Sequence, residues 1–358
     1  MRLLLLPLTW IFAGIIALRN LFFDKEIFKS VSYSIPVISV GNITVGGTGK
    51  TPLTEYIIRL LSDKKRCALL SMGYGRKSKG ARLADVSSSF KDIGDEPMQI
   101  KSKFNNLIVA VAEKRVEGME ILLNLPQPPE IVILDDAFQH RYINPKLSIL
   151  VMDYYRPVWK DFILPAGNLR ESRKNIKRAD IVVINKCPKN LSVEEADFIK
   201  NKLKLSDYQQ LFFTAIDYKE PVRIDNSINQ PFSKIIKEKK NPIAAVAGIG
   251  NPNPFFDMVK NFGKPVKTFR FSDHYHFTIS DINKIINNIQ NTSNDELPLI
   301  LTTEKDAVRI KAIPELTPLQ ASYFWYIPIE LLFLFENQFL FDDFLQNKIF
   351  ETFTCFGK

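Results

Sequence analysis

The chain has 358 residues, 46% of them hydrophobic, which suits a folded protein of two domains and excludes an intrinsically disordered chain. Its formal net charge of +9 suits an anionic membrane surface or a phosphorylated substrate. Nucleic acid is not an expected partner because the sequence has no zinc-finger spacing, RNA-binding signature or long basic run, and the three scattered cysteines indicate reduced thiols of a cytoplasmic protein.

The first predicted element is an apolar N-terminal helix. Residues 3–18 are almost wholly apolar, with Arg2 before them and Arg19 after them. A helix of that length spans about 24 Å, less than the ~30 Å hydrocarbon core, and extension through Phe23 restores the length. A cleaved signal peptide would need a site of small residues, which is not evident, and a buried core helix is a further alternative. We expect residues 1–24 to be a membrane anchor, which either spans the bilayer or lies in one leaflet.

A strand, a glycine-rich loop and a helix then follow in the order of a phosphate-binding loop. The apolar run 36–40 precedes the loop, and a helix is predicted from Thr51 onward. Backbone N–H groups of such a loop face a polyphosphate, and the helix N-terminus adds a positive dipole. Lys50 is expected to reach the β- and γ-phosphates of ATP, and the Thr51 hydroxyl to ligate Mg²⁺. The predicted nucleotide-binding residues are Thr44 (where the consensus has its first glycine), Val45, Gly46, Gly47, Thr48, Gly49, Lys50 and Thr51.

The later apolar runs predict an α/β fold. Short runs with several β-branched residues alternate with helical patterns or loops, and this alternation is typical of a parallel sheet covered on both faces. A polar segment at 219–242 marks a boundary, after which a second α/β pattern begins. We expect a P-loop NTPase-like parallel-sheet core at 25–220, a smaller α/β domain at 221–320 and an aromatic C-terminal tail at 321–358.

The strand predicted at 179–186 ends in Asn185-Lys186. These residues match the start of the N-K-x-D motif of GTPases, but Pro188 stands where the motif has its aspartate. We therefore predict a strand end near the nucleotide without base specificity.

Two carboxylates, Asp135 and Asp136, end the apolar strand predicted at 131–134. An acidic strand end commonly organises Mg²⁺ in phosphate-loop enzymes, so Asp135 is expected to hold the metal or its water shell and Asp136 to project toward the substrate cleft. Solvated acids at a strand end are the structural alternative. In the loop 165–171, Arg170 could neutralise the transferred phosphate and Glu171 could reach Mg²⁺, or the two could form a surface ion pair.

Basic and polar side chains in several loops are candidates for substrate binding. The loops 73–77 and 113–115 are basic and suit an anionic head group, whereas 139–141 follows the acidic pair. The imidazole of residue 140 is equally compatible with substrate contact and with a structural role. The predicted substrate-binding residues are Asn42, Arg76, Arg115, Gln139 and His140.

Phosphoryl transfer to an alcohol needs a base for the hydroxyl proton, and two segments could supply one. Asp95 precedes a proline at a predicted helix start, where an N-cap is the favoured structural interpretation. His274 lies in a polar segment that holds two of the three histidines of the chain, where simple exposure is an equal alternative. A carboxylate–imidazole pair of these two residues could act as the base.

Taken together, the motifs resemble the tetraacyldisaccharide 4'-kinase family, the lipid A 4'-kinases of Gram-negative bacteria. The matching strings are GNITVGGTGKTP, GYGRKSKG, GDEP, AEKRVEG, ILDDAFQHR, LPAGNLRE, AGIGNP, FSDHY and LTTEKDAV, which lie in family order between residue 41 and about residue 308. A phosphate-binding loop is common to many families, whereas this ordered set is specific. One departure is Met72, where the family pattern is expected to have an arginine.

The resemblance implies an ATP- and Mg²⁺-dependent kinase. Its substrate would be the 4'-hydroxyl of a tetraacylated glucosamine disaccharide 1-phosphate, a lipid A precursor, at the cytoplasmic face of the bacterial inner membrane, with no obligate protein partner. The implied fold has a cleft between a phosphate-loop core and a smaller α/β domain. The two domains must close on each other for Asp95 and His274 to meet.

The resemblance also assigns roles to residues. It implies that Asp95 polarises the His274 imidazole and that Arg115 and Arg170 are cations of the cleft. It places three acids near the metal and the reacting phosphate, Asp135, Asp136 and Glu171. The predicted catalytic residues are Asp95, His274, Lys50, Asp136 and Arg170, and the predicted metal ligands are Thr51, Asp135 and Glu171.

Two other functions remain open. A membrane-associated P-loop ATPase or GTPase that switches a protein partner would need no alcohol acceptor and no histidine base. A membrane scaffold with a vestigial nucleotide fold would show no turnover, and the intact Gly-Lys-Thr and aspartate pair argue against it.

Overall fold

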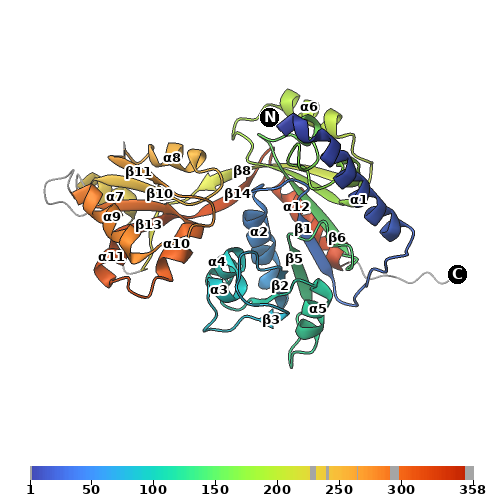
Figure 1. The fold of residues 1–358 in the computed structure, drawn as a ribbon, viewed down its shortest axis with the longest axis horizontal. Helices are drawn as coiled ribbons and strands as arrows, with labels where there is room; N and C mark the ends of the chain where they lie inside the picture. Colours follow the sequence, from blue (N-terminus) through green and yellow to red (C-terminus); the bar gives the residue numbers. More distant parts are fainter. Residues whose placement is uncertain (1, 226–230, 239–241, 264, 291–297, 351–358) are drawn as a thin grey trace.

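The computed structural model describes residues 2–225, 231–238, 242–263, 265–290 and 298–350, which form two α/β lobes (Figure 1). The chain leaves the larger lobe through strand β8 (Gln210–Tyr218) and returns to it through β14 (Ile329–Phe333). These two strands pair antiparallel and lie in the connection between the lobes. The two lobes are therefore joined by a short two-stranded ribbon.

The sheet of the larger lobe has nine strands in the order β14-β8-β7-β6-β1-β5-β2-β4-β3. Strands β8 to β4 of this order run parallel, and the two edge strands run antiparallel to their neighbours. Strand β1 lies between β5 and β6, so the loop at its carboxyl end faces loops from both halves of the sheet, where ligands bind in folds of this kind. The remaining strands are β1 (Val37–Gly41), β2 (Cys67–Ser71), β3 (Arg82–Leu83), β4 (Ile108–Val111), β5 (Ile131–Asp135), β6 (Leu147–Asp153) and β7 (Ile181–Asn185).

Helices cover both faces of this sheet, as predicted for buried parallel strands. One face packs against α2 (Lys50–Ser62), α4 (Asp95–Lys103) and α12 (Gln338–Phe350). The other face packs against α5 (Arg115–Leu123) and α6 (Val193–Leu203). Shorter helices are η1 (Arg2–Leu5), α3 (Phe90–Ile93), η2 (Val158–Lys160) and η3 (Arg173–Arg178).

The smaller lobe is built on a five-stranded sheet in the order β11-β10-β12-β13-β9. Its first four strands in that order run parallel, and the short edge strand β9 runs antiparallel. The strands are β9 (Val222–Arg223), β10 (Ile243–Ala247), β11 (Lys267–Arg270), β12 (Leu299–Thr303) and β13 (Phe324–Ile327). The helices are α7 (Phe232–Glu238), α8 (Asn253–Val259), α9 (Ile279–Gln290), α10 (Glu304–Lys311) and α11 (Pro318–Ser322).

The aromatic segment predicted as a tail at 321–358 is divided between the two lobes. Strand β13 completes the small sheet, β14 completes the large one, and α12 packs on the core through Phe341 and Leu345. Residues 351–358 lie outside the described residues. Burial accounts for part of the apolar composition of the segment, whereas Phe339 and Leu340 of α12 are exposed.

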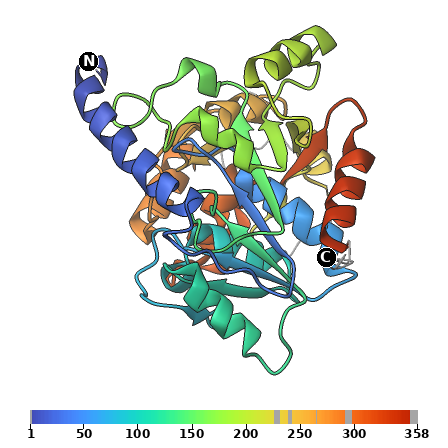
Figure 2. The same cartoon turned by 90° about the vertical axis from the view of Figure 1, so that its right-hand side faces the viewer.

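Helix α1 (Leu6–Asp24) is, among the described residues, the one helix long and apolar enough to cross a membrane. It lies along the outside of the larger lobe, as the N-terminal helix in Figure 2 shows. Thr9 Oγ1 accepts a hydrogen bond from the Ala166 N–H at 3.0 Å, and Asn20 Nδ2 donates to Glu171 at 3.4 Å. The opposite side of the helix is apolar and exposed, with Ile11 63% accessible. Its other exposed apolar residues are Leu8, Trp10, Ile15, Leu18 and Leu21.

Candidate active site

The glycine-rich loop between β1 and α2 depends on left-handed backbone at Gly46 (φ 86°) and Gly49 (φ 88°). Helix α2 begins one residue later, at Lys50, so the loop and the helix N-terminus meet as predicted. Asn185 Nδ2, at the end of β7, donates to the Thr48 and Gly49 carbonyls at 3.2 Å each. A Cβ added to Gly49 would lie 1.9 Å from that nitrogen. Position 49 therefore requires glycine for both its backbone angle and its contact with β7.

Basic side chains hold the outer carbonyls of the same loop. Lys186 Nζ binds the Gly47 carbonyl and, at 2.9 Å, the Asp153 carboxylate. Arg156 Nη1 donates to the Val45 carbonyl at 3.0 Å. Since these carbonyls are occupied from outside, the loop is held in its curved form by the protein itself. The sequence indicated only that the β7 end lies near this loop; the supporting roles of residues 153, 156 and 186 were missed because they need the sheet order to be known.

The acidic pair lies directly beside the loop. Asp135 is the last residue of β5 and pairs in register with Val40 of β1. Burial raises the pKa of Asp135 to about 6, with Glu96 adding to the shift and Lys50 opposing it. Asp136 contacts Lys50 Nζ at 3.4 Å.

Arg170 completes this charge cluster. Its Nη1 donates to Asp136 Oδ1 at 3.0 Å, so one carboxylate joins the loop lysine to the cation of a distant loop. Burial opposes ionisation of Asp136, but Lys50 and Arg170 hold its pKa below the usual value. Three of the predicted catalytic residues, Lys50, Asp136 and Arg170, thus lie together at the carboxyl edge of the sheet.

The two candidates for the base meet across the lobes. Asp95 begins α4 in the larger lobe, and His274 follows β11 in the smaller lobe. Their Oδ2 and Nδ1 atoms are 2.8 Å apart. The hydrogen bond that His274 donates to Asp95 raises the pKa of His274, although burial opposes the shift. Burial disfavours the Asp95 carboxylate, but His274 and Arg309 lower its pKa to about 2. The structure thus brings the two predicted residues into contact across the lobes.

Comparison with known proteins identifies the family. The model of the family described as Tetraacyldisaccharide-1-P 4'-kinase matches residues 1–349. The chain belongs to the tetraacyldisaccharide 4'-kinase family. A tetraacyldisaccharide 4'-kinase of Flavobacterium johnsoniae is 45% identical over 338 residues, which cover 94% of each protein. One of Phocaeicola vulgatus is 42% identical over 340 residues, 94% of this chain and 92% of that protein.

A solved member of the 4'-kinase family has the same fold. LpxK from Aquifex aeolicus, determined in complex with ATP, superposes with a TM-score of 0.76 at 30% identity, over 98% of this chain and 99% of that one. The resemblance inferred from the ordered motifs and the predicted α/β fold class are both confirmed.

The environment of Glu171 in this 4'-kinase differs from that of a free metal ligand. The residue is 1% exposed, and Arg178 Nη2 binds both of its carboxylate oxygens at 2.7 Å. Asn175 and Gln139 donate to the two oxygens at 2.6 and 2.8 Å. A metal ion would have to replace these bonds. The arrangement instead uses Glu171 to connect α1, through Asn20, with the loop that carries Arg170.

The residues predicted to bind substrate separate into two groups. Asn42 and Gln139 lie at the phosphate-binding loop, where Asn42 donates to Thr48 Oγ1 at 3.2 Å and Gln139 donates to the Asn42 carbonyl at 2.8 Å. The expectation for Arg115 needs correction, because its side chain is buried rather than in the cleft (2% exposed). Arg115 donates to the Ala112 carbonyl after β4 at 2.6 Å and to the Asp135 carbonyl of β5 at 3.3 Å, and so connects the ends of the two strands.

Two further predicted substrate contacts also have partners within the protein. Arg76 forms an ion pair with Glu113 at 2.6 Å and donates to the Gly80 carbonyl at 2.8 Å. His140 Nε2 accepts from the Arg115 N–H at 3.4 Å. Burial, reinforced by Arg115, lowers the pKa of His140 to about 4, which keeps the imidazole neutral near pH 7. The structural interpretation of His140 is the one that these contacts favour.

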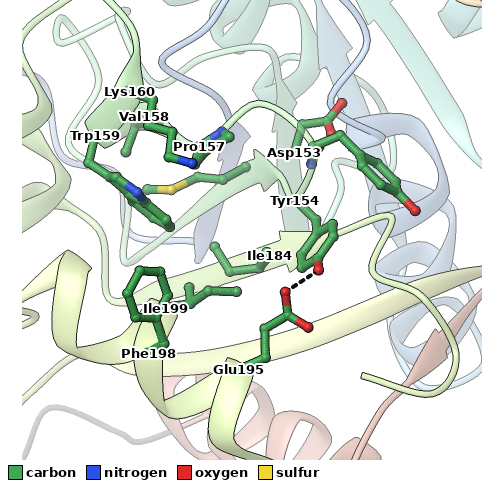
Figure 3. Close-up of a pocket in the computed structure, with 12 residues that line it drawn as sticks. Asp153, Tyr154, Pro157, Val158, Trp159, Lys160, Ile184, Glu195, Phe198 and Ile199 are labelled. Atoms are coloured by element: carbon green, nitrogen blue, oxygen red, sulfur yellow. Dashed lines mark hydrogen bonds between the residues drawn. The ribbon is translucent and has the colours of Figure 1, made fainter. Parts of the chain in front are cut away.

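A separate cavity of about 250 Å³ opens beneath α6, at the carboxyl ends of β6 and β7 (Figure 3). Trp159, Phe198 and Ile199 give it an apolar lining, and Tyr154 donates to Glu195 at its rim. Of the predicted site residues, none lines this cavity. Its lining residue Asp153 also binds Lys186, which binds the Gly47 carbonyl of the nucleotide loop.

Proposed function

We propose that the protein is an ATP-dependent kinase that phosphorylates the 4'-hydroxyl of tetraacyldisaccharide 1-phosphate, a lipid A precursor. The observation that carries this proposal is the contact of 2.8 Å between Asp95 and His274, one from each lobe. A nucleotide-driven switch that only hydrolyses ATP or GTP needs no such base for an alcohol. The closely related proteins that bear the name of this activity support the same function.

ATP binding is assigned to the loop before α2. The related LpxK from Aquifex aeolicus was determined with ATP, and here Gly46, Gly49 and Lys50 form the corresponding type of loop at a helix N-terminus. Lys50 would bind the outer phosphates. Arg170 lies on the other side of Asp136 and could stabilise the charge of the transferred group.

The Asp95–His274 pair supplies the proton acceptor. Because Asp95 is ionised, it holds the Nδ1–H of His274 and leaves Nε2 free to accept a proton from the 4'-hydroxyl. The oxygen can then attack the outermost phosphorus of ATP, whose bond to the β-phosphate oxygen breaks so that ADP leaves. The small lobe must remain docked for this step, because His274 belongs to that lobe and Asp95 to the other.

The residues present fit a Mg²⁺ ion that is held mainly by phosphate and water. Among the described residues, no group of three or more acidic, histidine or cysteine side chains is arranged around a metal position. Within the described part of the chain, buried Asp135 has one side-chain hydrogen-bond donor, Ser71 Oγ at 3.4 Å, and it lies beside the loop that precedes Thr51. One or two protein oxygens plus substrate phosphates are the usual Mg²⁺ ligands in such enzymes. When bound, the ion would offset phosphate charge, with Thr51 and Asp135 as its protein ligands.

Helix α1 is assigned to the cytoplasmic surface of the bacterial inner membrane. The contacts of Thr9 and Asn20 with the core are separated by eleven residues, or about 16 Å of helix. A helix held to the protein over that length does not cross a bilayer alone. Its exposed apolar side would instead enter one leaflet, where an acylated substrate is retained by about 0.8 kcal/mol per buried methylene.

The decisive test is a kinase assay with γ-labelled ATP, Mg²⁺ and the tetraacyldisaccharide 1-phosphate in detergent micelles. We expect label in the lipid, located at the 4' position by mass spectrometry. The matched control is a substrate that already carries a 4'-phosphate, which should accept no label. Rapid ATP or GTP hydrolysis that is independent of lipid would instead support the switch function.

Membrane placement is tested with the double variant Ile11→Asn/Ile15→Asn, which keeps the bonds of Thr9 and Asn20 to the core. We expect a several-fold larger soluble fraction after cell lysis. The control is Val193→Asn, which changes an exposed apolar residue on α6. Equal membrane recovery of the double variant and wild type would place the anchor elsewhere.

A further inference from the structure

Arg309, a residue that the sequence did not indicate, has its whole guanidinium group bound at the interface between the lobes. It lies on α10 and is 2% exposed. Its Nε and Nη2 atoms donate to Asp95 Oδ2 at 3.1 and 2.6 Å, whereas Nη1 donates to the Gly248 carbonyl at 3.1 Å. All three nitrogens therefore have partners, and one of those partners is the carboxylate that holds His274.

The small lobe holds this arginine in place independently of the larger lobe. Asp306 is 0% exposed and accepts from Arg309 Nη1 at 2.9 Å. Asp306 also accepts from the Gly248 N–H at 2.9 Å and from Thr303 Oγ1 at 2.7 Å. These small-lobe contacts of Nη1 restrict the orientation of the Arg309 side chain without any contribution from Asp95. The guanidinium is a rigid fork, so its orientation determines where a bound carboxylate lies.

We propose that Arg309 is a positioning residue of phosphoryl transfer, which binds Asp95 when the small lobe docks and orients the Asp95 carboxylate toward His274. This inference rests on the kinase function proposed above. The same oxygen of Asp95 receives both Arg309 and His274, so the carboxylate is oriented by two groups of the small lobe at once. Without Arg309, the carboxylate would have His274 as its one small-lobe partner among the contacts described here.

Arg309 also affects the basicity of His274. Its Nη2 lies 3.2 Å from His274 Nδ1, and its positive charge opposes protonation of the imidazole. The other groups that face His274 are Asp95 and Glu96 of α4, Asp273 in its own loop and, by ring contact, Tyr74. Lys305 neutralises Glu96 at 2.7 Å. Removal of Arg309 would leave the Asp95 charge uncompensated, and the imidazole would then hold its proton to higher pH.

A general weakening of the docking between the two lobes would have a different effect on the pH profile from loss of Arg309. Helices α4 and α10 are also connected by the ion pair between Lys103 and Glu304 at 2.6 Å, which touches neither Asp95 nor His274. Lys103 also binds Glu55 of α2 at 2.6 Å. Lys103→Gln therefore weakens the same interface while Asp95 and His274 keep their own contacts. This variant is the matched control.

The test compares the pH profiles of kcat/KM for wild type, Arg309→Met, Arg309→Lys and Lys103→Gln, with circular dichroism to establish that each is folded. For Arg309→Met we expect the acidic limb to move up by about one pH unit, with turnover at pH 7 lower by about 10²-fold. Arg309→Lys keeps the positive charge but lacks the planar guanidinium group. Turnover should therefore fall, while the acidic limb of the pH profile should move by less than in Arg309→Met. Lys103→Gln should leave the limb in place.

The possible outcomes test the kinase function and the positioning role of Arg309 separately. If wild type does not phosphorylate the lipid, the proposed function fails. If wild type is active and folded Arg309→Met keeps the wild-type limb, or Lys103→Gln moves it equally, the positioning role is overturned while the kinase function stands. If Arg309→Met does not fold, Arg309→Lys decides: wild-type turnover in that variant would also overturn the proposal.

Discussion

The phosphate-binding loop and the interface between the lobes are assembled in different ways. The loop comes from one continuous segment, residues 42–51, which lies between a strand and a helix. At the interface, His274 and Arg309 are separated from Asp95 by 179 and 214 positions in the chain. The contacts of the nucleotide loop lie within the larger lobe, whereas the Asp95–His274 contact exists only when the lobes are docked. If the proposed roles hold, substitutions in one region should impair ATP binding and substitutions in the other should impair proton abstraction.

The largest expected effects come from Lys50→Ala and Asp95→Ala, which separate the two regions. Lys50→Ala should lower turnover by about 10²–10³-fold and weaken ATP binding, because a cation at the outer phosphates is lost. Asp95→Ala should lower turnover by about 10²–10⁴-fold with little change in ATP affinity. Steady-state kinetics and ATP titration measure both, with half-exposed Arg59→Ala on the same helix as the control. Near-normal turnover of Asp95→Ala would remove it from the mechanism.

The next effect is a pH dependence at the interface. In wild type, activity should fall as the pH drops through the raised pKa of His274, since the protonated imidazole cannot accept a proton. His274→Ala should lower turnover by about 10²-fold near neutral pH. Its deficit should shrink at higher pH, where hydroxide replaces the missing base. A deficit that is constant from pH 6 to pH 9 would indicate positioning instead of proton abstraction.

A smaller effect tests whether the loop is formed without the small lobe. Gly49→Ala places a side chain at positive φ against Asn185 and should cost about 1–3 kcal/mol of stability even without nucleotide. Gly47→Ala is the matched control, because a Cβ there meets nothing within 4 Å. Thermal unfolding without ATP measures both. Equal melting temperatures for the two variants would contradict the preformed loop.

The smallest effect concerns Glu304 at the start of α10. Burial raises its pKa to about 7, so its ionisation disfavours the folded state. Its contribution to stability is fully present below about pH 4.5 and is lost as the pH rises through about 7. Glu304→Gln should therefore reduce the fall in melting temperature between pH 6 and pH 8 by about 1–3 °C. Half-exposed Glu330→Gln is the control and should leave that fall unchanged.

Much of the larger lobe could be predicted because its signals are local. Buried parallel strands require apolar runs, and Asp135 and Asp136 follow one such run directly. A loop that turns backbone N–H groups inward requires glycine, which makes residues 46–51 recognisable without a structure. The ordered motifs then identified the family, and the family comparison confirmed it.

The environments of individual charged side chains could not be predicted in this way. Arg115 and Glu171 stand in motifs that suggested a cleft cation and a metal ligand, yet both are buried and bound by protein groups. Arg309 is three residues after Asp306, a spacing that on a helix usually means an exposed ion pair. The burial of Arg309 depends on contact with α4 of the other lobe. No local sequence pattern predicts that contact.

The amino-acid sequence alone determined the nucleotide loop, the α/β architecture and the family, because strand burial, glycine angles and motif order are properties of short segments. Only the tertiary structure decided which carboxylate meets which cation: Asp95 with His274 and Arg309, Glu171 with Arg178, and Asp136 between Lys50 and Arg170. The physical reason is that a buried charge must find a partner of opposite sign, and the nearest partner in space is set by the docking of sheets and helices from distant parts of the chain.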